Sequence, residues 1–243
     1  MQLAQSMSRL GTESAFKILA KAKAMEAAGR DIINLGIGAP DFRTPDNIVE
    51  AGKKAMDDGF HFYTPAKGLP QVREAVVNDI QKYRGVTVDP ENVMVVPGGK
   101  PTMFFAIMIF GEPGAEIMYP NPGFPIYESM INFSGAKAVP IELQEENGFA
   151  FDPDRVLAQI NDNTRLIIIN TPANPTGGVL ERDVIERFVK GLEKFPNVVL
   201  MSDEIYARLL YDDLEHVSFL EYESIRDRTI LLDGWSKTYS MKG

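Results

Sequence analysis

The sequence predicts an α/β protein of three layers, in which helices cover both faces of a mostly parallel central sheet. One observation behind this prediction is that short apolar runs alternate with helical stretches from residue 93 to the end of the chain. A second is that these runs are apolar at nearly every position, as strands are when both faces of a sheet are covered. In such sheets ligands bind beside the carboxyl ends of the strands.

The first third of the chain predicts three helices and one short strand. A stretch rich in Ala, Lys and Glu favours a helix over residues 14–28, and Gly29 ends it. Residues 32–35 are mostly apolar and predict a strand. Pro45 begins a second helix that reaches residue 58, and apolar residues at helical spacing predict a third over residues 69–84.

The remaining chain alternates between the two kinds of element. The apolar runs that predict strands are residues 93–96, 116–119, 138–141, 166–170, 198–201 and 229–232. The helical stretches between them are residues 101–110, 125–133, 153–160 and 181–194. Each strand is thus followed by a helix or a loop that would return the chain to the next parallel strand.

Composition narrows the class of protein. The 243 residues are 44% hydrophobic and carry a net charge of -9, which allows a substantial core and argues against a nucleic-acid-binding surface. The absence of cysteine excludes disulfides and thiolate catalysis. His61 and His216 lack metal-ligand spacing, so we interpret both as structural and expect no metal. No segment reads as a secretion signal or a membrane span, so we expect a cytoplasmic protein that contacts no membrane.

Three ionisable side chains stand just beyond predicted strands. Asp203 and Tyr206 follow residues 198–201, and Lys237 follows residues 229–232. Asp203 alone could be a surface carboxylate or a helix cap, but its place after four apolar residues favours a buried and partnered carboxylate. A carboxylate, a phenol and an amine at one edge of a sheet are the groups that a site for pyridoxal 5′-phosphate (PLP) requires.

A glycine pair precedes the helix predicted at residues 101–110. Glycines let the backbone approach an anion, and the amino end of a helix supplies N–H donors. Gly99 and Lys100 are therefore a candidate phosphate site. The alternative is an ordinary turn, and the pattern matches neither the P-loop nor the dinucleotide fingerprint.

Other candidate residues are ambiguous when taken singly. Asn174 lies in a loop over residues 170–178 that is rich in Pro and Gly, where the alternative is a structural turn. Phe124 and Tyr63 read singly as core or surface aromatics. The two aromatic residues indicate a functional site only when they are considered together with the other motifs.

Taken together, the motifs resemble those of the fold-type I PLP-dependent enzymes, specifically the class I/II aminotransferases of the aspartate aminotransferase family. The resemblance extends from about residue 32 to residue 243. It rests on six segments in the family's order and at its spacing: residues 36–42, 63–65 with Gly68 and Arg73, 98–100, 174–177, 202–206 and 236–237.

The resemblance implies which residues would hold the cofactor ring. Lys237 would bind PLP covalently and then move a proton as base and acid. Asp203 would face the ring nitrogen, while Tyr206 and Asn174 would hydrogen-bond the phenolic oxygen. Phe124 would stack on the ring, where many relatives carry Trp or Tyr.

The same resemblance implies how the phosphate and the substrate are bound. Gly99, Lys100 and Ser236 would hold the phosphate. Tyr63 would reach the phosphate in a neighbouring subunit, which implies a homodimer with shared sites. The residues implied to contact the substrate are Gly38, Lys100 and Asn174.

The activity implied is transfer of an amino group from an L-amino acid to a 2-oxo acid by a ping-pong mechanism. Lys100 lies where some relatives that act on dicarboxylates hold a lysine, so aspartate or glutamate is the predicted donor. Three alternatives stay open: another PLP reaction such as that of a β-lyase, a PLP-binding sensor without catalysis, and an inactive domain that only binds a partner.

The sequence departs from the family's pattern in two places. Gly234 stands where many relatives have a phosphate-binding hydroxyl, which leaves that role to Ser236. Relatives also continue past residue 243 for about another domain, with two arginines that bind the phosphate and the substrate carboxylate. We therefore expect an arm and part of a small domain over residues 1–46, an incomplete large PLP-binding domain over residues 47–243, and no C-terminal small domain. Residues 1–243 alone are not expected to be a stable, active transaminase.

Overall fold

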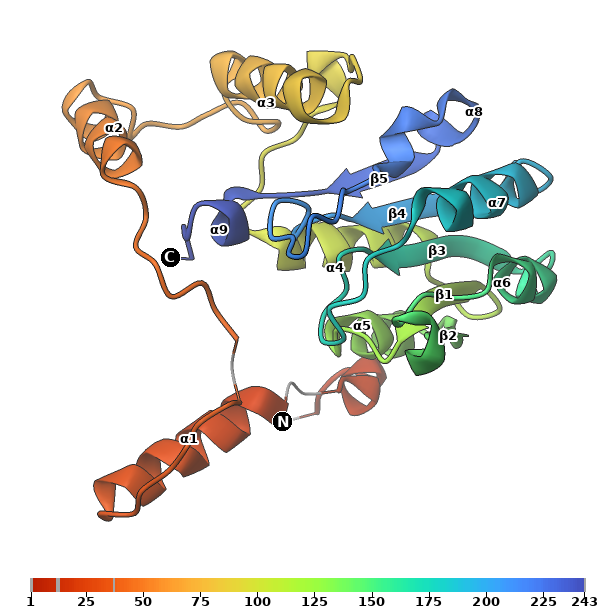
Figure 1. The fold of residues 1–243 in the computed structure, drawn as a ribbon, viewed down its shortest axis with the longest axis horizontal. Coiled ribbons are helices and arrows are strands. Elements are labelled where there is room, and N and C mark those ends of the chain that lie inside the picture. The colour runs from red at the N-terminus through yellow and green to blue at the C-terminus, as the bar shows by residue number, and fades with distance from the viewer. Residues whose placement is uncertain (1, 12–13, 37, 243) are drawn as a thin grey trace.

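The computed structural model describes residues 2–11, 14–36 and 38–242. Ile37, which belongs to the family segment at residues 36–42, lies outside the described residues. The described chain forms a central sheet with helices on both faces, and the N-terminal helix α1 (Ser14–Ala27) extends away from it (Figure 1). Among the described helices, none combines the length and the apolar composition that a bilayer crossing requires.

Five parallel strands form the sheet, in the order β2-β1-β3-β4-β5. The strands are β1 (Glu116–Asn121), β2 (Lys137–Glu142), β3 (Thr164–Asn170), β4 (Val199–Asp203) and β5 (Thr229–Leu232). They confirm five of the predicted apolar runs. Because all the strands are parallel, their carboxyl ends share one edge of the sheet.

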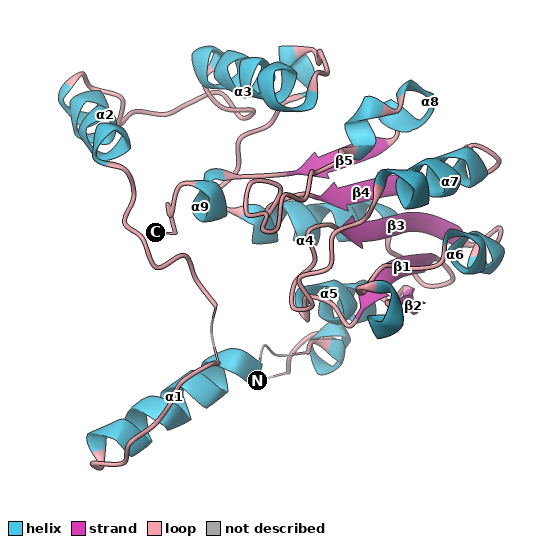
Figure 2. Ribbon diagram, viewed as in Figure 1, coloured by secondary structure: helices cyan, strands magenta, loops and turns pink. Residues whose placement is uncertain are grey.

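The helices predicted from the sequence lie close to their expected positions, and two short α-helices, at residues 223–226 and 235–238, were not predicted. Besides α1 the helices are α2 (Asp46–Asp57), α3 (Pro70–Arg84), α4 (Gly99–Phe110), α5 (Ile126–Ser134), α6 (Pro153–Gln159), α7 (Arg182–Leu192), α8 (Glu223–Arg226) and α9 (Trp235–Thr238). Figure 2 shows α6 and α7 in front of the sheet and α4 behind it. The three-layer α/β fold is therefore confirmed.

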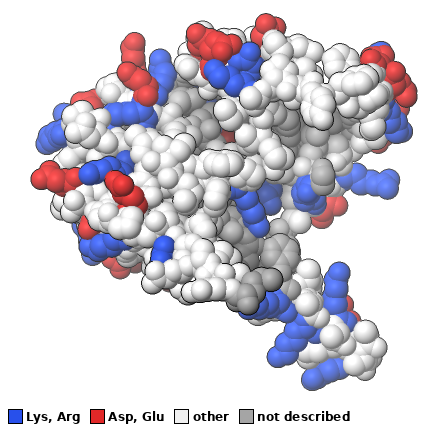
Figure 3. Space-filling model, turned by 180° about the vertical axis from the view of Figure 1, so that it is seen from behind, with Lys and Arg blue, Asp and Glu red and all other residues white. Residues whose placement is uncertain are grey.

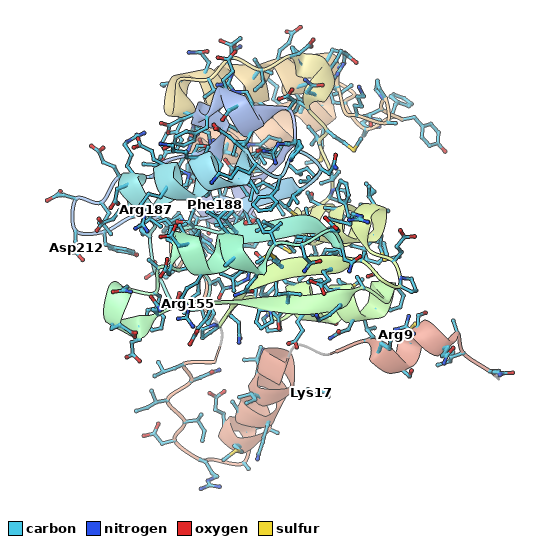
Figure 4. The ribbon with its side chains drawn as sticks, turned by 90° about the vertical axis from the view of Figure 1, so that its right-hand side faces the viewer. Arg9, Lys17, Arg155, Arg187, Phe188 and Asp212 are labelled. Atoms are coloured by element: carbon cyan, nitrogen blue, oxygen red, sulfur yellow. The ribbon has the colours of Figure 1, made fainter. Side chains whose placement is uncertain are left out.

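Alternate side chains of each central strand enter the two layers. On β3, Leu166 and Ile168 pack in the core formed with α4 and α5, whereas Ile167 and Ile169 pack in the core formed with α6 and α7. Both faces of the strand are thus apolar because both are covered. On α7, Phe188 is fully buried while the neighbouring Arg187 side chain is 55% exposed (Figure 4).

Two predicted strands do not form. Residues 32–35 are extended but unpaired, and the side chains of Ile33 and Leu35 lie in solvent, 85% and 90% exposed. Residues 93–96 join no sheet: the Val95 N–H donates to the Lys67 carbonyl, and the bonds of this segment to Pro90 and from Gly98 are local turns. An apolar run becomes a strand only where a neighbouring strand accepts its hydrogen bonds, and periodicity does not report that neighbour.

Candidate active site

The register of the sheet brings three of the predicted segments together. Asn170 ends β3 opposite Asp203 at the end of β4, and Asp203 lies opposite Leu232 at the end of β5. The segments that carry Asn174, Tyr206 and Lys237 therefore leave adjacent strands at the same edge. α9 lies at this edge in Figure 1.

Asp203 lies at the base of this arrangement and is 1% exposed. Its two carboxylate oxygens accept hydrogen bonds from neutral groups, the Tyr127 hydroxyl at 2.5 Å and the Ile205 N–H at 3.2 Å. Burial raises the pKa of Asp203 to about 6, and the two hydrogen bonds oppose that rise. The expectation of a buried, partnered carboxylate is confirmed, although both partners are neutral.

Lys237 and Tyr206 lie together above the ends of β4 and β5. The Lys237 Nζ atom is 5.6 Å from the centre of the Tyr206 ring. Burial raises the pKa of the Tyr206 phenol, and the nearby Asp203 carboxylate adds to the rise. Ser236 precedes Lys237 in α9, so amine and hydroxyl leave one short helix.

The close passage of the chain before α9 explains the missing hydroxyl at residue 234. A Cβ atom at Gly234 would lie 3.2 Å from Ile205 Cδ1, which is tighter than most contacts of this kind. A larger side chain would crowd the segment between Asp203 and Tyr206. Glycine at this position therefore favours a tight approach of the segment before α9 to the segment after β4.

Asn174 is held in place by the last residue of β3. The Asn170 side chain accepts a hydrogen bond from the Asn174 N–H at 2.8 Å and donates to the Asp203 carbonyl at 3.0 Å. Asn170 is 6% exposed, so it links the loop to the end of β4 inside the protein. The loop at Asn174 is therefore positioned relative to Asp203 rather than being an independent turn.

The amino end of α4 approaches the same edge of the sheet. A Cβ atom at Gly99 would lie 3.5 Å from Leu232 Cδ2, so the first turn of α4 lies against the end of β5. Gly98 precedes it with a φ of 94°, a conformation that favours glycine. The Lys100 Nζ atom is 5.9 Å from the centre of the Phe124 ring. The ring of Phe124 in turn packs edge-on against Tyr127, with ring centres 6.0 Å apart.

The segment that follows Gly38 is tied to the chain after Lys237. The Ser240 hydroxyl donates to the Phe42 carbonyl at 2.7 Å, and the Thr44 hydroxyl donates to the Ser240 carbonyl at 2.9 Å. Gly38 itself is exposed. Its segment therefore reaches the edge of the sheet where Lys237 lies.

Tyr63 is the one predicted site residue that the structure leaves apart from the others. Its side chain is fully exposed, at 106% of the reference area, in the connection between α2 and α3. Nothing in the described part of the chain places it near Lys237.

Sequence reasoning missed two residues that organise the site. Tyr127 is buried beneath Phe124 and donates to Asp203, and Asn170 connects Asn174 to β4. A signal existed for each. Tyr127 lies three residues after Phe124 at the start of a helix, and Asn170 is a polar residue that ends a run of four apolar ones.

We also searched the rest of the described surface for a second candidate site. A surface hollow of about 670 Å³ lies between residues 144–153 and α7 and includes none of the predicted site residues. Its cation, Arg187, pairs with Asp154 at 2.7 Å. The described residues contain no cluster of three or more His, Cys, Asp or Glu side chains placed to bind a metal ion.

Fold and site together define an α/β protein with a ligand-binding edge that offers a buried carboxylate, an amide, a phenol and an amine. A family model described as aminotransferase class I and II matches residues 30–243. The chain belongs to this family.

Individual relatives agree with this assignment. The chain is 40% identical over 213 residues to an aspartate aminotransferase of Pyrococcus horikoshii, covering 88% of this chain and 54% of the relative. It superposes with a TM-score of 0.95 and 30% identity on the aspartate aminotransferase from Rhizobium meliloti, covering 100% of this chain and 61% of that one. The aspartate aminotransferase from Thermus thermophilus with maleate gives a TM-score of 0.93 at 32% identity, covering 100% and 63%. The chain thus spans between about half and two thirds of the length of these proteins.

Proposed function

We propose that these residues form the cofactor-binding part of a PLP-dependent aminotransferase, which moves an amino group from an L-amino acid to a 2-oxo acid by a ping-pong mechanism. The observation that carries the proposal is the environment of Asp203. This carboxylate is buried at the carboxyl end of a central strand, and the described residues offer it only neutral hydrogen-bond donors. A protonated ring nitrogen is the cationic partner that such a group lacks.

The residues around Asp203 fit PLP. When bound, PLP supplies an aldehyde that reacts with amines and a ring that withdraws electrons from the reacting carbon. Asp203 would hold the proton on the ring nitrogen, and Tyr206 and Asn174 would hydrogen-bond the phenolic oxygen. Phe124 would stack on the ring. The Lys237 amine would bind the cofactor and then carry a proton from the substrate Cα as general base.

The phosphate of PLP would lie at the amino end of α4. Gly99 and Lys100 lie in the first turn of α4, and the helix dipole favours an anion at this end. The Ser236 hydroxyl would complete this set, since α9 lies at the same edge of the sheet. Helix α4 has twelve residues, long enough for its dipole to act.

Substrate binding involves Gly38, Lys100 and Asn174 in this proposal. Lys100 projects over Phe124, the ring that would cover the cofactor, so its charge would lie near the distal end of a bound substrate. A dicarboxylate amino acid, aspartate or glutamate, is the donor that such a cation favours. The Thermus thermophilus relative was solved with maleate, itself a dicarboxylate.

A homodimer is the proposed assembly. One side of α4 presents Phe105, Met108 and Ile109 to solvent, with exposed fractions of 59%, 37% and 72%. Seen from behind, the molecule has few charged side chains over the centre of this face (Figure 3). Exposed apolar side chains grouped on one helix mark an interaction surface. Tyr63 would then reach the site of the partner subunit, and residues 1–46 would form an arm and part of a small domain beside a large domain over residues 47–243. A cytoplasmic location belongs to the same proposal.

The proposal is tested by the visible spectrum of the protein with added PLP. We expect an absorbance band from the covalently bound cofactor, and borohydride reduction should leave the adduct on Lys237 as read by peptide mass. Lys237→Ala should abolish the band, whereas Lys190→Ala on α7 should retain it. If the wild-type protein develops no band, PLP binding is wrong.

The reaction class is tested by adding amino acids to the PLP-bound protein. Loss of the band with aspartate or glutamate, and its return with a 2-oxo acid, is the expected result. Release of ammonia and pyruvate without a 2-oxo acid would favour a β-lyase instead. In Lys100→Ala the response to acidic donors should fall while that to neutral donors stays unchanged.

A further inference from the structure

A buried ion-pair network lies directly behind the candidate site. Arg84, the last residue of α3, has a side chain that is 1% exposed. Its Nε atom donates to Glu204 at 2.8 Å, and its Nη2 atom donates to Asp233 at 2.8 Å. One guanidinium therefore bridges two carboxylates that are 29 residues apart in the sequence.

Glu204 is the centre of this network and is fully buried. One of its oxygens accepts from the hydroxyls of Ser202 and Ser218, at 2.9 and 2.8 Å. The other is bonded by Arg84 and lies 2.9 Å from the Nε2 atom of His216. This confirms the structural interpretation of His216. With four partners on two oxygens, the orientation of Glu204 is fixed.

The two carboxylates belong to the segments that carry the proposed cofactor residues. Glu204 follows Asp203 directly, and its N–H donates to the Leu232 carbonyl at 2.9 Å. Asp233 is four residues before Lys237 and accepts a hydrogen bond from the Gly234 N–H at 2.6 Å. The guanidinium thus joins the end of β4 to the turn that leads into α9.

We propose that Arg84 is a positioning residue for the cofactor site, which holds the Asp203 and Lys237 segments together and neutralises the two carboxylates beside them. The inference rests on the proposed PLP function. It adds to the site a residue that lies far in sequence from Asp203 and Lys237. Arg84 touches neither the cofactor nor the substrate. Its effect passes through Glu204 and Asp233.

Charge balance supports the inference. Glu204 and Asp233 both raise the pKa of Asp203, after the larger effect of burial. Despite burial, the pKa of Glu204 is lowered, first by His216 and then by Arg84, so Glu204 is held in its charged form. The positive charge of the guanidinium, paired with Glu204 and Asp233, opposes the field of both carboxylates at Asp203.

His216 shares one Glu204 oxygen with Arg84. Arg84 and Arg208 both lie over the ring of Tyr83, and Arg208 pairs with Asp79. Without Arg84, Asp233 would lose an ion pair, and Glu204 would keep only His216 and the two serine hydroxyls as side-chain partners among the described residues.

A role in stability alone accounts less well for the arrangement. Buried ion pairs often contribute no more stability than apolar residues of the same volume, since desolvation offsets their attraction. The network also leaves Arg84 Nη1 and His216 Nδ1 without a partner among the described residues. What it does provide is a fixed distance between two strand ends.

The test is the apparent pKa of the absorbance band of bound PLP. In Arg84→Gln the loss of a positive charge should raise that pKa by about one unit or more, and the dissociation constant for PLP should rise roughly tenfold. Arg84→Lys keeps the charge, so its band should shift by less than half as much. Arg73→Gln, on the same helix and paired with the exposed Glu91, is the control and should not shift the band.

A second variant covers the case in which Arg84→Gln does not fold. Asp233→Asn removes one negative charge and keeps the acceptor for Gly234, so the apparent pKa of the band should fall. A purely structural role would lower the melting temperature in these variants and leave the band pKa at the wild-type value, which would overturn the inference. Absence of the band in the wild-type protein would instead refute the proposed function.

Discussion

At the scale of single residues, the energetic cost of the site is concentrated in Asp203. Burial of this carboxylate, which is 1% exposed, disfavours its charged form and raises its pKa from 3.8 to about 6, although the hydrogen bonds from Tyr127 and Ile205 oppose the rise. The cofactor-free protein should therefore be strained at neutral pH. Binding of a cationic ring nitrogen would remove that strain and couple folding to cofactor binding.

This linkage predicts a pH dependence with a definite sign. The folded-state pKa of Asp203 lies above its unfolded value, so the contribution of this group to stability is fully present below pH 4 and is lost as the pH rises to about 6. The loss amounts to about 3 kcal/mol at most. Asp203→Asn removes the titration. The difference in unfolding free energy between the cofactor-free wild type and this variant should therefore change across this range and be constant on either side.

Urea unfolding at a series of pH values measures the difference. Tyr127→Phe provides a check on the cause, because it removes the hydrogen bond that lowers the pKa of Asp203. In that variant the same step should move to higher pH. A difference between wild type and Asp203→Asn that does not vary between pH 4 and 6 would contradict the assigned environment of the carboxylate.

At the scale of elements, the turns after the strands set the positions of the site residues. The turn between β1 and α5 carries Phe124, and it closes tightly on itself. A Cβ atom at Gly123 would lie 2.1 Å from the Pro120 carbonyl oxygen, a backbone atom that has no free rotation with which to move away. The position of the Phe124 ring, which would stack on the cofactor in the proposed function, therefore depends on the glycine beside it.

Gly123→Ala should displace this turn. We expect a loss of about 1–3 kcal/mol in unfolding free energy from overpacking, together with weaker PLP binding because Phe124 moves. Gly52→Ala is the matched control: it lies in the exposed part of α2, where a new Cβ atom meets nothing within 4 Å. There the same substitution should stabilise the protein by about 0.5–1 kcal/mol. Equal effects of the two substitutions would show that the turn is not constrained.

At the scale of the whole molecule, the charge-poor face of α4 has the features of a subunit interface. The same helix contributes its amino end to the proposed phosphate site and its exposed apolar side to this face. Assembly and cofactor binding would therefore share one rigid element.

Ile109→Glu tests this assembly. Burying an unpaired carboxylate in an apolar interface is unfavourable, so the dissociation constant of the dimer should rise roughly tenfold or more. Sedimentation equilibrium measures it. Lys190→Glu on α7, on the opposite layer, should have no effect. A protein that is monomeric before substitution, or a dimer that Ile109→Glu leaves intact, would rule out this face as the interface.

Much of the architecture could be predicted from the chain because the signals are local. Five apolar runs predicted the five strands, and glycine, proline and helical spacing predicted the helices between them. Since parallel strands end at one edge, the order of the motifs also predicted that the segments carrying Asn174, Asp203 and Lys237 would meet. The prediction of a strand at residues 93–96 was wrong because strand formation also depends on a neighbouring strand, which the local sequence pattern does not report.

The sequence by itself determined the layers of the fold and the edge of the sheet at which the candidate site lies, because burial and turn formation follow from residues close together in the chain. Only the tertiary structure decided which groups contact one another there. The hydrogen bond from Tyr127 to Asp203 spans 76 residues, and the ion pairs of Arg84 with Glu204 and Asp233 span 120 and 149. Such contacts leave no periodic signal, because their geometry is set by how the helices pack on the sheet.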